Sequence, residues 1–157
     1  MCVDADILSW DDISSACTLI AEEVTDGSPP DVVVGIARGG LVPAVMIAHL
    51  LGLRDLRHVC LTRTAGDQIN APKRPIATAC GPDSLGDLHG RSVLIIDDVA
   101  GSGKTIEAAA ALVWSLNPSR LRTAVCVVND GNWCGGQLPD HVAIRSSRWV
   151  VFPWECI

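Results

Sequence analysis

Two acids, a loop of small residues and a threonine occupy residues 97–105, DDVAGSGKT, between the apolar runs SVLII and IEAAAALVWSL. The first run predicts a buried strand and the second a helix, so the stretch forms a strand–loop–helix junction. Backbone N–H groups at the start of a helix bind phosphate, because they have no partner within the helix and lie at the positive end of its dipole. The phosphate site expected here comprises Gly101, Ser102, Gly103, Lys104 and Thr105.

The ending GKT suggests the P-loop of ATPases and GTPases, whose pattern is G-x-x-x-x-G-K-[ST]. Counting back from Gly103, the first glycine of that pattern falls on Asp98, whose carboxylate would repel phosphate oxygens. The P-loop interpretation therefore fails on both position and charge. Asp97 and Asp98 only accept hydrogen bonds, so they suit sugar hydroxyls, directly or through Mg²⁺ and its waters. A glycine-rich turn without a ligand stays open as the alternative.

This junction resembles the 5-phosphoribosyl-1-pyrophosphate (PRPP) motif of type I phosphoribosyltransferases. Three further segments are similar to the xanthine-guanine branch of that family: LSWDDI near the N-terminus, GIARGGLVPA at 35–44 and WVVFPWE at 149–155. The resemblance implies an enzyme that moves a 5-phosphosugar from PRPP, or a related sugar pyrophosphate, to a purine-type nucleobase. It also implies release of pyrophosphate, Mg²⁺ as cofactor and assembly into a homo-oligomer.

The same resemblance assigns roles to the acids and to the loop at 37–40. Asp97 and Asp98 would be catalytic and would hold the sugar and the metal. Arg38, also catalytic, would stabilise the departing pyrophosphate, because a guanidinium binds phosphate through two parallel hydrogen bonds. A cis peptide between Ala37 and Arg38 is implied as well. The expected pyrophosphate-binding residues are Ala37, Arg38, Gly39, Gly40 and Lys73.

The C-terminal segment is expected to bind the base. By resemblance, Trp149 stacks on the purine and the backbone carbonyl of Val150 reads its edge. Taken alone, Trp149 is more typical of an ordinary core residue. The family branch reads a 6-oxo group with a lysine where alignment places Asp130. Because an aspartate accepts where a lysine donates, we expect an amino-bearing base such as adenine. Two alternatives stay open. In the first, NDGNW is a surface Asx turn that Asp130 caps itself; in the second, Asp130 is misaligned and the substrate is guanine, xanthine or hypoxanthine.

Gly101 marks a second departure from that branch, which carries a third acid there as a candidate proton acceptor near the base. Glycine cannot move a proton, and its missing side chain leaves space near the anomeric carbon. A modified sugar pyrophosphate, such as a ketose analogue of PRPP, is therefore conceivable. A PRPP-binding regulator that has lost turnover is a further alternative.

Residues 63–90 are polar and rich in glycine and proline, with little periodicity. A loop of that length in a compact domain is usually functional. We expect the segment at about 63–86 to close over the site as a flexible hood and exclude water. Lys73 and Arg74 lie within it, where they could reach pyrophosphate or form a solvated basic pair.

Apolar runs and helical patterns alternate along the rest of the chain. This alternation predicts an α/β fold with a central, mostly parallel sheet flanked by helices, the type I phosphoribosyltransferase fold, in a single domain 1–157. A capping pair, Ser9 and Asp12, begins the first helix. Helices are expected at 10–25, from 42 and at 103–116, and strands at 32–36, 57–61, 92–97, 122–128, 141–145 and 148–152.

Bulk composition excludes several classes of protein. The net charge of −6, with no visible basic patch, argues against nucleic acid as a partner and so against a nucleic-acid-binding regulator. Seven cysteines without a CxxC pair are typical of reduced core residues in a cytoplasmic protein. The most apolar stretch, 32–53, is interrupted by Arg38, two glycines and Pro43, so no membrane partner is expected.

Overall fold

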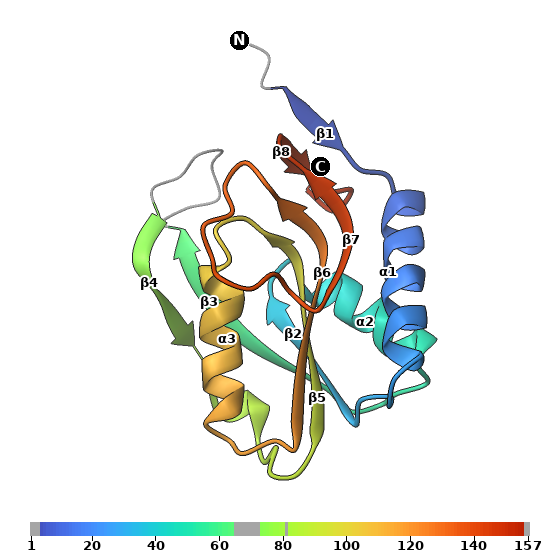
Figure 1. Cartoon of the computed structure of the whole chain (residues 1–157), viewed down its shortest axis with the longest axis vertical. Coiled ribbons are helices and arrows are strands. Elements are labelled where there is room, and N and C mark those ends of the chain that lie inside the picture. Colours follow the sequence, from blue (N-terminus) through green and yellow to red (C-terminus); the bar gives the residue numbers. More distant parts are fainter. Residues whose placement is uncertain (1–3, 65–72, 81, 156–157) are drawn as a thin grey trace.

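A computed structural model describes residues 4–64, 73–80 and 82–155 (Figure 1). The elements are β1 (Ala5–Ile7), α1 (Trp10–Thr25), β2 (Val32–Ala37), α2 (Leu41–Leu50), β3 (Leu56–Thr64), β4 (Lys73–Cys80), the 3-10 helix η1 (Pro82–Leu85), β5 (Ser92–Ala100), α3 (Lys104–Trp114), β6 (Arg120–Asn129), β7 (His141–Ser146) and β8 (Trp149–Val151).

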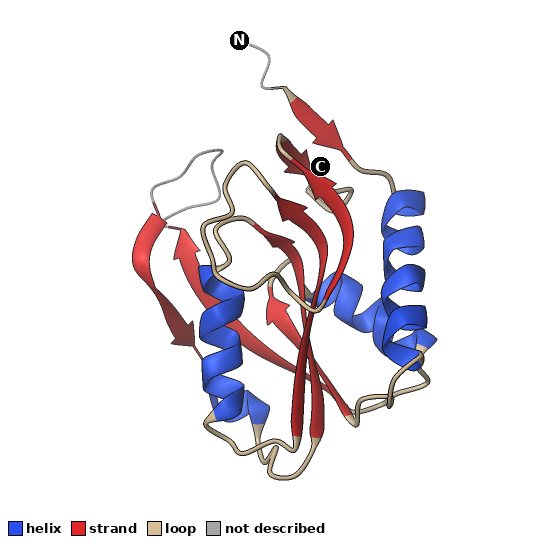
Figure 2. Cartoon of the chain, viewed as in Figure 1, coloured by secondary structure: helices blue, strands red, loops and turns tan. Residues whose placement is uncertain are grey.

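In the described part of the chain, one six-stranded sheet has the order β4-β3-β2-β5-β6-β7. All its neighbouring strands are parallel except β3 and β4. Helices α1 and α2 pack on one face, and α3 packs on the other (Figure 1). A separate parallel pair, β1 and β8, joins the two ends of the chain (Figure 2). The predicted α/β fold with a central, mostly parallel sheet is confirmed.

The strand order reverses between β2 and β5, which are parallel neighbours. From β2 the chain passes through α2 to β3 on one side, and from β5 through α3 to β6 on the other. Because parallel crossovers are right-handed, the two helices cover opposite faces. Ligands of open α/β sheets bind outside the carboxyl ends of the strands at such a reversal. The loops at 38–40 and 101–103 leave the sheet there.

Local sequence explains the elements that frame this point. The run VVVGIA of β2 is almost wholly buried, as expected for a strand covered on both faces. Helix α1 begins with a capping box in which the Ser9 side chain accepts from the Asp12 backbone N–H at 3.1 Å. The Asp12 carboxylate accepts in turn from the Ser9 N–H at 2.7 Å. The expected capping pair is confirmed, and it sets where α1 starts.

Strand β4 corrects the loop expected over residues 63–90. Lys73–Cys80 pairs antiparallel with β3, and residues up to Thr64 belong to β3 itself. An edge strand needs only one partner and tolerates a proline such as Pro75, so it carries a weak sequence signal. Residues 65–72, and the side chains of Lys73 and Arg74, lie outside the described residues. The hood and its basic pair therefore stay predictions.

The cysteines only partly match the expectation of a reduced core. Cys17 and Cys126 are free and buried, whereas Cys134 is free and exposed. Cys134 follows β6 in a glycine-rich loop, which explains why an apolar environment was the wrong expectation for it. Among the described residues, no helix has the length and apolar character needed to cross a membrane.

Arg122 on β6 secures the end of α1 and supplies a test of the fold. Its buried guanidinium donates to the carbonyls of Val24 at 3.2 Å and Ser28 at 2.6 Å. We expect Arg122→Met to lower the free energy of unfolding by about 2 kcal/mol, because both carbonyls lose a charged donor. Urea unfolding measures this change. Arg120→Met, at an exposed position two residues earlier, should change stability little; an equal loss would contradict the role of Arg122.

Candidate active site

Two adjacent carboxylates near the end of β5 form the centre of the candidate site. Asp97 is 7% exposed, and its Oδ1 accepts from the Asp98 backbone N–H at 3.0 Å. Asp98 is half-buried, and its Oδ1 accepts from the Val99 N–H at 2.8 Å. Burial raises the pKa of Asp97 well above the usual range, and the charge of Asp98 adds to the effect. The fold thus holds two acids together where ionising both is unfavourable.

The pKa of Asp98 is also raised, chiefly by burial. Hydrogen bonds lower this pKa in part, whereas the negative charge of Glu155 raises it further. The C-terminal segment therefore ends close enough to the acid pair to act on it electrostatically. Glu155 is itself held by the Phe152 backbone N–H, which donates to its Oε2 at 2.9 Å.

The loop at 37–40 packs directly against the acid pair. A methyl group on Gly39 would overlap the carboxylate of Asp98. One on Gly40 would lie 2.9 Å from Asp97 Oδ1 and 2.5 Å from the carbonyl oxygen of Ile36. Only glycine leaves room for the carboxylates at both positions. The peptide between Ala37 and Arg38 is cis, as the sequence resemblance implied, and the Arg38 side chain is exposed.

The loop at 101–103 leads into α3 with a left-handed glycine. Gly103 is the N-cap residue, with φ of +85°, and no side chain caps the helix there. The first N–H groups of an α-helix have no partner within the helix, so they are available to an anion. Lys104 is exposed and Thr105 half-buried in the first turn. The expected phosphate residues therefore lie at a helix N-terminus, as predicted.

Trp149 and Val150 lie on β8, which pairs in parallel with β1. Trp149 is 36% exposed, so it is not the ordinary core residue that its type alone suggests. Asp6 of β1 fixes the approach to this strand. Its carboxylate accepts from Arg148 Nη2 at 2.6 Å and from the Ser146 hydroxyl at 2.6 Å. The N-terminal strand thereby helps to position the segment expected to bind the base.

Asp130 lies on the surface, and both of its carboxylate oxygens bind Arg145. The distances are 2.6 Å from Arg145 Nη2 and 3.1 Å from Arg145 Nε. This ion pair holds the pKa of Asp130 below its usual range. The Asn132 N–H donates to the Asn129 backbone carbonyl at 3.1 Å and to its side-chain oxygen at 3.2 Å, so NDGNW contains a β-turn rather than an Asx turn. The structure therefore favours the surface-turn alternative over a base-reading carboxylate.

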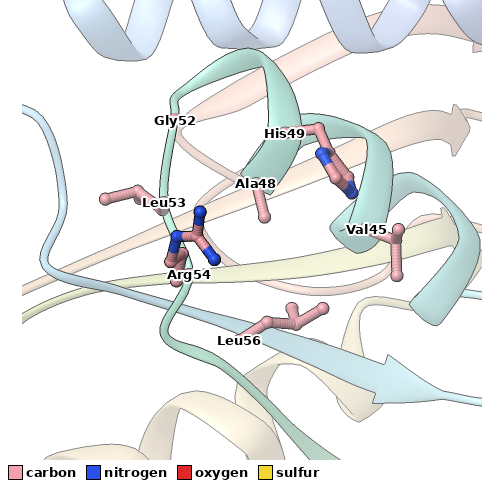
Figure 3. Close-up of a pocket in the computed structure, with 7 residues that line it drawn as sticks. All are labelled: Val45, Ala48, His49, Gly52, Leu53, Arg54 and Leu56. Atoms are coloured by element: carbon pink, nitrogen blue, oxygen red, sulfur yellow. The ribbon is translucent and has the colours of Figure 1, made fainter.

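A surface cavity of about 450 Å³ lies elsewhere, at the amino end of β3 (Figure 3). Since β3 is parallel to β2, this cavity is at the edge of the sheet opposite the acid pair. None of the expected site residues lines it. The lining residues are Val45, Ala48, His49, Gly52, Leu53, Arg54 and Leu56.

Comparison with known proteins decides the family. Residues 6–156 match the family model of the phosphoribosyl transferase domain. The chain belongs to this family. This phosphoribosyltransferase is an enzyme. It is 30% identical over 154 residues to the xanthine-guanine phosphoribosyltransferase of Cereibacter sphaeroides, and the alignment covers 94% of this chain and 85% of that protein.

Solved structures agree with the assignment. The purine phosphoribosyltransferase of Pyrococcus horikoshii superposes with a TM-score of 0.81 at 30% identity, covering 98% of this chain and 95% of that one. The xanthine-guanine-hypoxanthine phosphoribosyltransferase of Helicobacter pylori superposes with a TM-score of 0.76 at 16% identity, and the match covers 97% of this chain and 94% of that one. At that identity the second structure supports the fold only.

Several residues at the candidate site lie outside the set expected from the sequence. Glu155 acts on the acid pair, and Asp6 orders β8 through Arg148. Asp6 and Arg148 are too far apart in sequence for any local pattern to link them. Glu155 belongs to the WVVFPWE segment, so its position in that motif was an available signal.

Gly39 gives a direct test of the packing between loop and acids. We expect Gly39→Ala to lower phosphoribosyl transfer by about 100-fold, because the added methyl displaces the Asp98 carboxylate. Steady-state turnover and circular dichroism of the variant provide the measurement. Gly136→Ala is the matched control, since nothing lies within 4 Å of a methyl group there. Equal activity of the two variants would show that Asp98 does not need its present position.

The raised pKa of Asp97 predicts how stability depends on pH. An acid with a raised pKa binds its proton more tightly in the folded state, so stability falls as pH rises above the ordinary aspartate value of about 3.9. Asp97→Asn removes this loss. In metal-free buffer the variant should melt higher than wild type near neutral pH, and the difference should vanish near pH of about 4. A variant that is less stable at neutral pH would contradict the assignment.

Proposed function

We propose that this phosphoribosyltransferase moves the 5-phosphoribosyl group of PRPP to a 6-oxopurine, namely guanine, xanthine or hypoxanthine, and releases pyrophosphate. The observation that carries the proposal is the direct packing of Gly39 and Gly40 against Asp97 and Asp98 at the strand-order reversal. This arrangement brings an anion-binding loop, two hydroxyl-binding acids and a helix N-terminus to one edge of the sheet.

Each part of the donor has a matching group in this arrangement. The 5-phosphate binds the N-terminus of α3, with hydroxyl donors from Ser102 and Thr105 and a charge from Lys104. Asp97 and Asp98 accept hydrogen bonds from the ribose hydroxyls. The pyrophosphate lies along residues 37–40, where Arg38 offsets the charge that develops on the leaving group.

Mg²⁺ fits the chemistry of the acid pair. Adjacent carboxylates with raised pKa values supply hard oxygen ligands whose mutual repulsion a divalent cation relieves. Asp97 and Asp98 are the residues that would hold it, directly or through water. When bound, the ion would offset the charge of the pyrophosphate. Among the described residues, no group of three or more metal-ligating side chains occurs, so the substrate would complete the coordination.

The preference for a 6-oxopurine replaces the adenine preference expected from the sequence. The sequence predicted that Asp130 would accept a hydrogen bond from an exocyclic amine of the base, but both of its carboxylate oxygens already accept hydrogen bonds from Arg145. The two relatives with 30% identity carry names that state xanthine-guanine and purine phosphoribosyltransferase activity. The base itself stacks on Trp149, with Val150 at its edge.

The reaction displaces pyrophosphate from the anomeric carbon. The C–O bond to pyrophosphate breaks, a C–N bond to a purine ring nitrogen forms, and that nitrogen loses its proton. Holding base, sugar and leaving group in one geometry lowers the barrier. Gly101 provides no side chain for the proton, so the acceptor differs from the third acid of the family branch.

A pyrophosphate-release assay with Mg²⁺ and PRPP tests the proposal. Guanine, xanthine, hypoxanthine and adenine are supplied separately, and we expect release with at least one 6-oxopurine and much less with adenine. Asp98→Asn should lower turnover by about 100-fold or more, because it removes a charge that orients sugar and metal. Asp130→Asn is the matched control at a surface carboxylate and should leave the ranking of the bases unchanged.

Two outcomes would contradict parts of this proposal. Release with adenine alone would overturn the 6-oxopurine assignment. No release with any base would overturn PRPP as donor, and would favour a modified sugar pyrophosphate or a PRPP-binding regulator.

A further inference from the structure

The indole ring of Trp133 lies on the glycine that begins α3. A Cβ atom on Gly103 would be 2.7 Å from Trp133 Cη2, 2.8 Å from Cζ3 and 3.2 Å from Cζ2. The benzene edge of the indole therefore covers the Gly103 backbone at van der Waals distance. Gly103 is buried, although it belongs to a loop at the edge of the sheet. Trp133 is what closes one side of that loop.

The residues after Trp133 continue the same contact. Cys134 Sγ lies 3.7 Å from the carbonyl oxygen of Ser102. A Cβ atom on Gly135 would be 2.9 Å from Glu107 Oε1, 3.0 Å from Trp133 Cζ2 and 3.3 Å from the Ser102 carbonyl oxygen. The segment thus follows the phosphate loop and reaches the first turn of α3. We call residues 129–136 the bridge segment.

The other end of the bridge segment is anchored beside the base-binding strand. The Asn129 amide donates to the Arg148 carbonyl at 2.9 Å, directly before Trp149. The Asp130 N–H donates to the Ser146 carbonyl at 2.8 Å, and its side chain binds Arg145. One short segment is therefore fixed to β7 and to the residue that precedes β8, and it also lies on the phosphate loop.

Loop packing of this kind has a physical consequence for binding. Glycine has more accessible backbone conformations than other residues. A loop that depends on Gly103 in its left-handed conformation is therefore costly in entropy to order. An aromatic ring that covers the glycine removes alternative conformations before the ligand arrives. Binding then loses less entropy, which strengthens affinity without a new contact to the ligand.

We propose that Trp133 is a positioning residue that preorganises the loop 101–103 for the 5-phosphate of the donor. The proposal deepens the proposed function and rests on it, because it assumes that this loop binds the sugar phosphate. Trp133 acts through Gly103 and touches no reacting atom. It should therefore affect donor affinity more than the chemical step.

The test compares Trp133→Ala and Trp133→Phe with wild type in steady-state kinetics and in calorimetric titration with ribose 5-phosphate. Trp133→Ala should raise KM for PRPP and Kd for ribose 5-phosphate by about tenfold, with kcat changed by less than about twofold. Trp133→Phe retains an aromatic ring and should restore most of the affinity. Trp114→Ala is the matched control, because Trp114 is exposed at the far end of α3.

Intrinsic fluorescence supplies a second measurement that needs only wild type and Trp133→Phe. Ribose 5-phosphate should change the emission of wild type, and Trp133→Phe should lose most of that change. Unchanged affinity in a folded Trp133→Ala variant, or equal emission changes in wild type and Trp133→Phe, would overturn the proposal. A wild type that turns over no purine contradicts the proposed function instead, and the titration still decides the role of Trp133.

Discussion

One buried and one half-buried carboxylate, packed directly against the neighbouring loop, are the constraint on which the site depends. Asp98 occupies the volume that a side chain at Gly39 would need, and Asp97 limits Gly40 in the same way. Burial raises both pKa values, because two ionised carboxylates side by side are unfavourable in this environment. A cation or a set of sugar hydroxyls would relieve this strain, which makes the site suited to a ligand.

The position of that cluster follows from sheet topology. Parallel strands β2 and β5 are neighbours in the sheet. The chain leaves β2 through α2 toward β3 and leaves β5 through α3 toward β6, so the two connections run in opposite directions across the sheet and cover its opposite faces. Their carboxyl ends therefore carry loops that meet without a helix between them. The same geometry explains why the 450 Å³ cavity at the other edge of the sheet includes none of these residues.

Segments distant in sequence complete the site through a second, smaller layer of contacts. Asp6 on the N-terminal strand binds Arg148 and Ser146, which precede Trp149, the tryptophan proposed to bind the base. The bridge segment connects the same region to the phosphate loop through Asn129 and Trp133. The proposed base and phosphate sites are thus linked by packed backbone, an arrangement that would hold both substrates in one geometry.

The sequence by itself determined the α/β class, the positions of most helices and strands, and the acid pair before a helix N-terminus. These features are encoded in periodicity, capping and glycine placement within a few residues. Only the tertiary structure decided that Asp130 pairs with Arg145, that Lys73–Cys80 forms an edge strand, and that Trp133 covers Gly103. Each of these depends on which strands become neighbours, and side-chain partners across neighbouring strands leave no local pattern in the sequence.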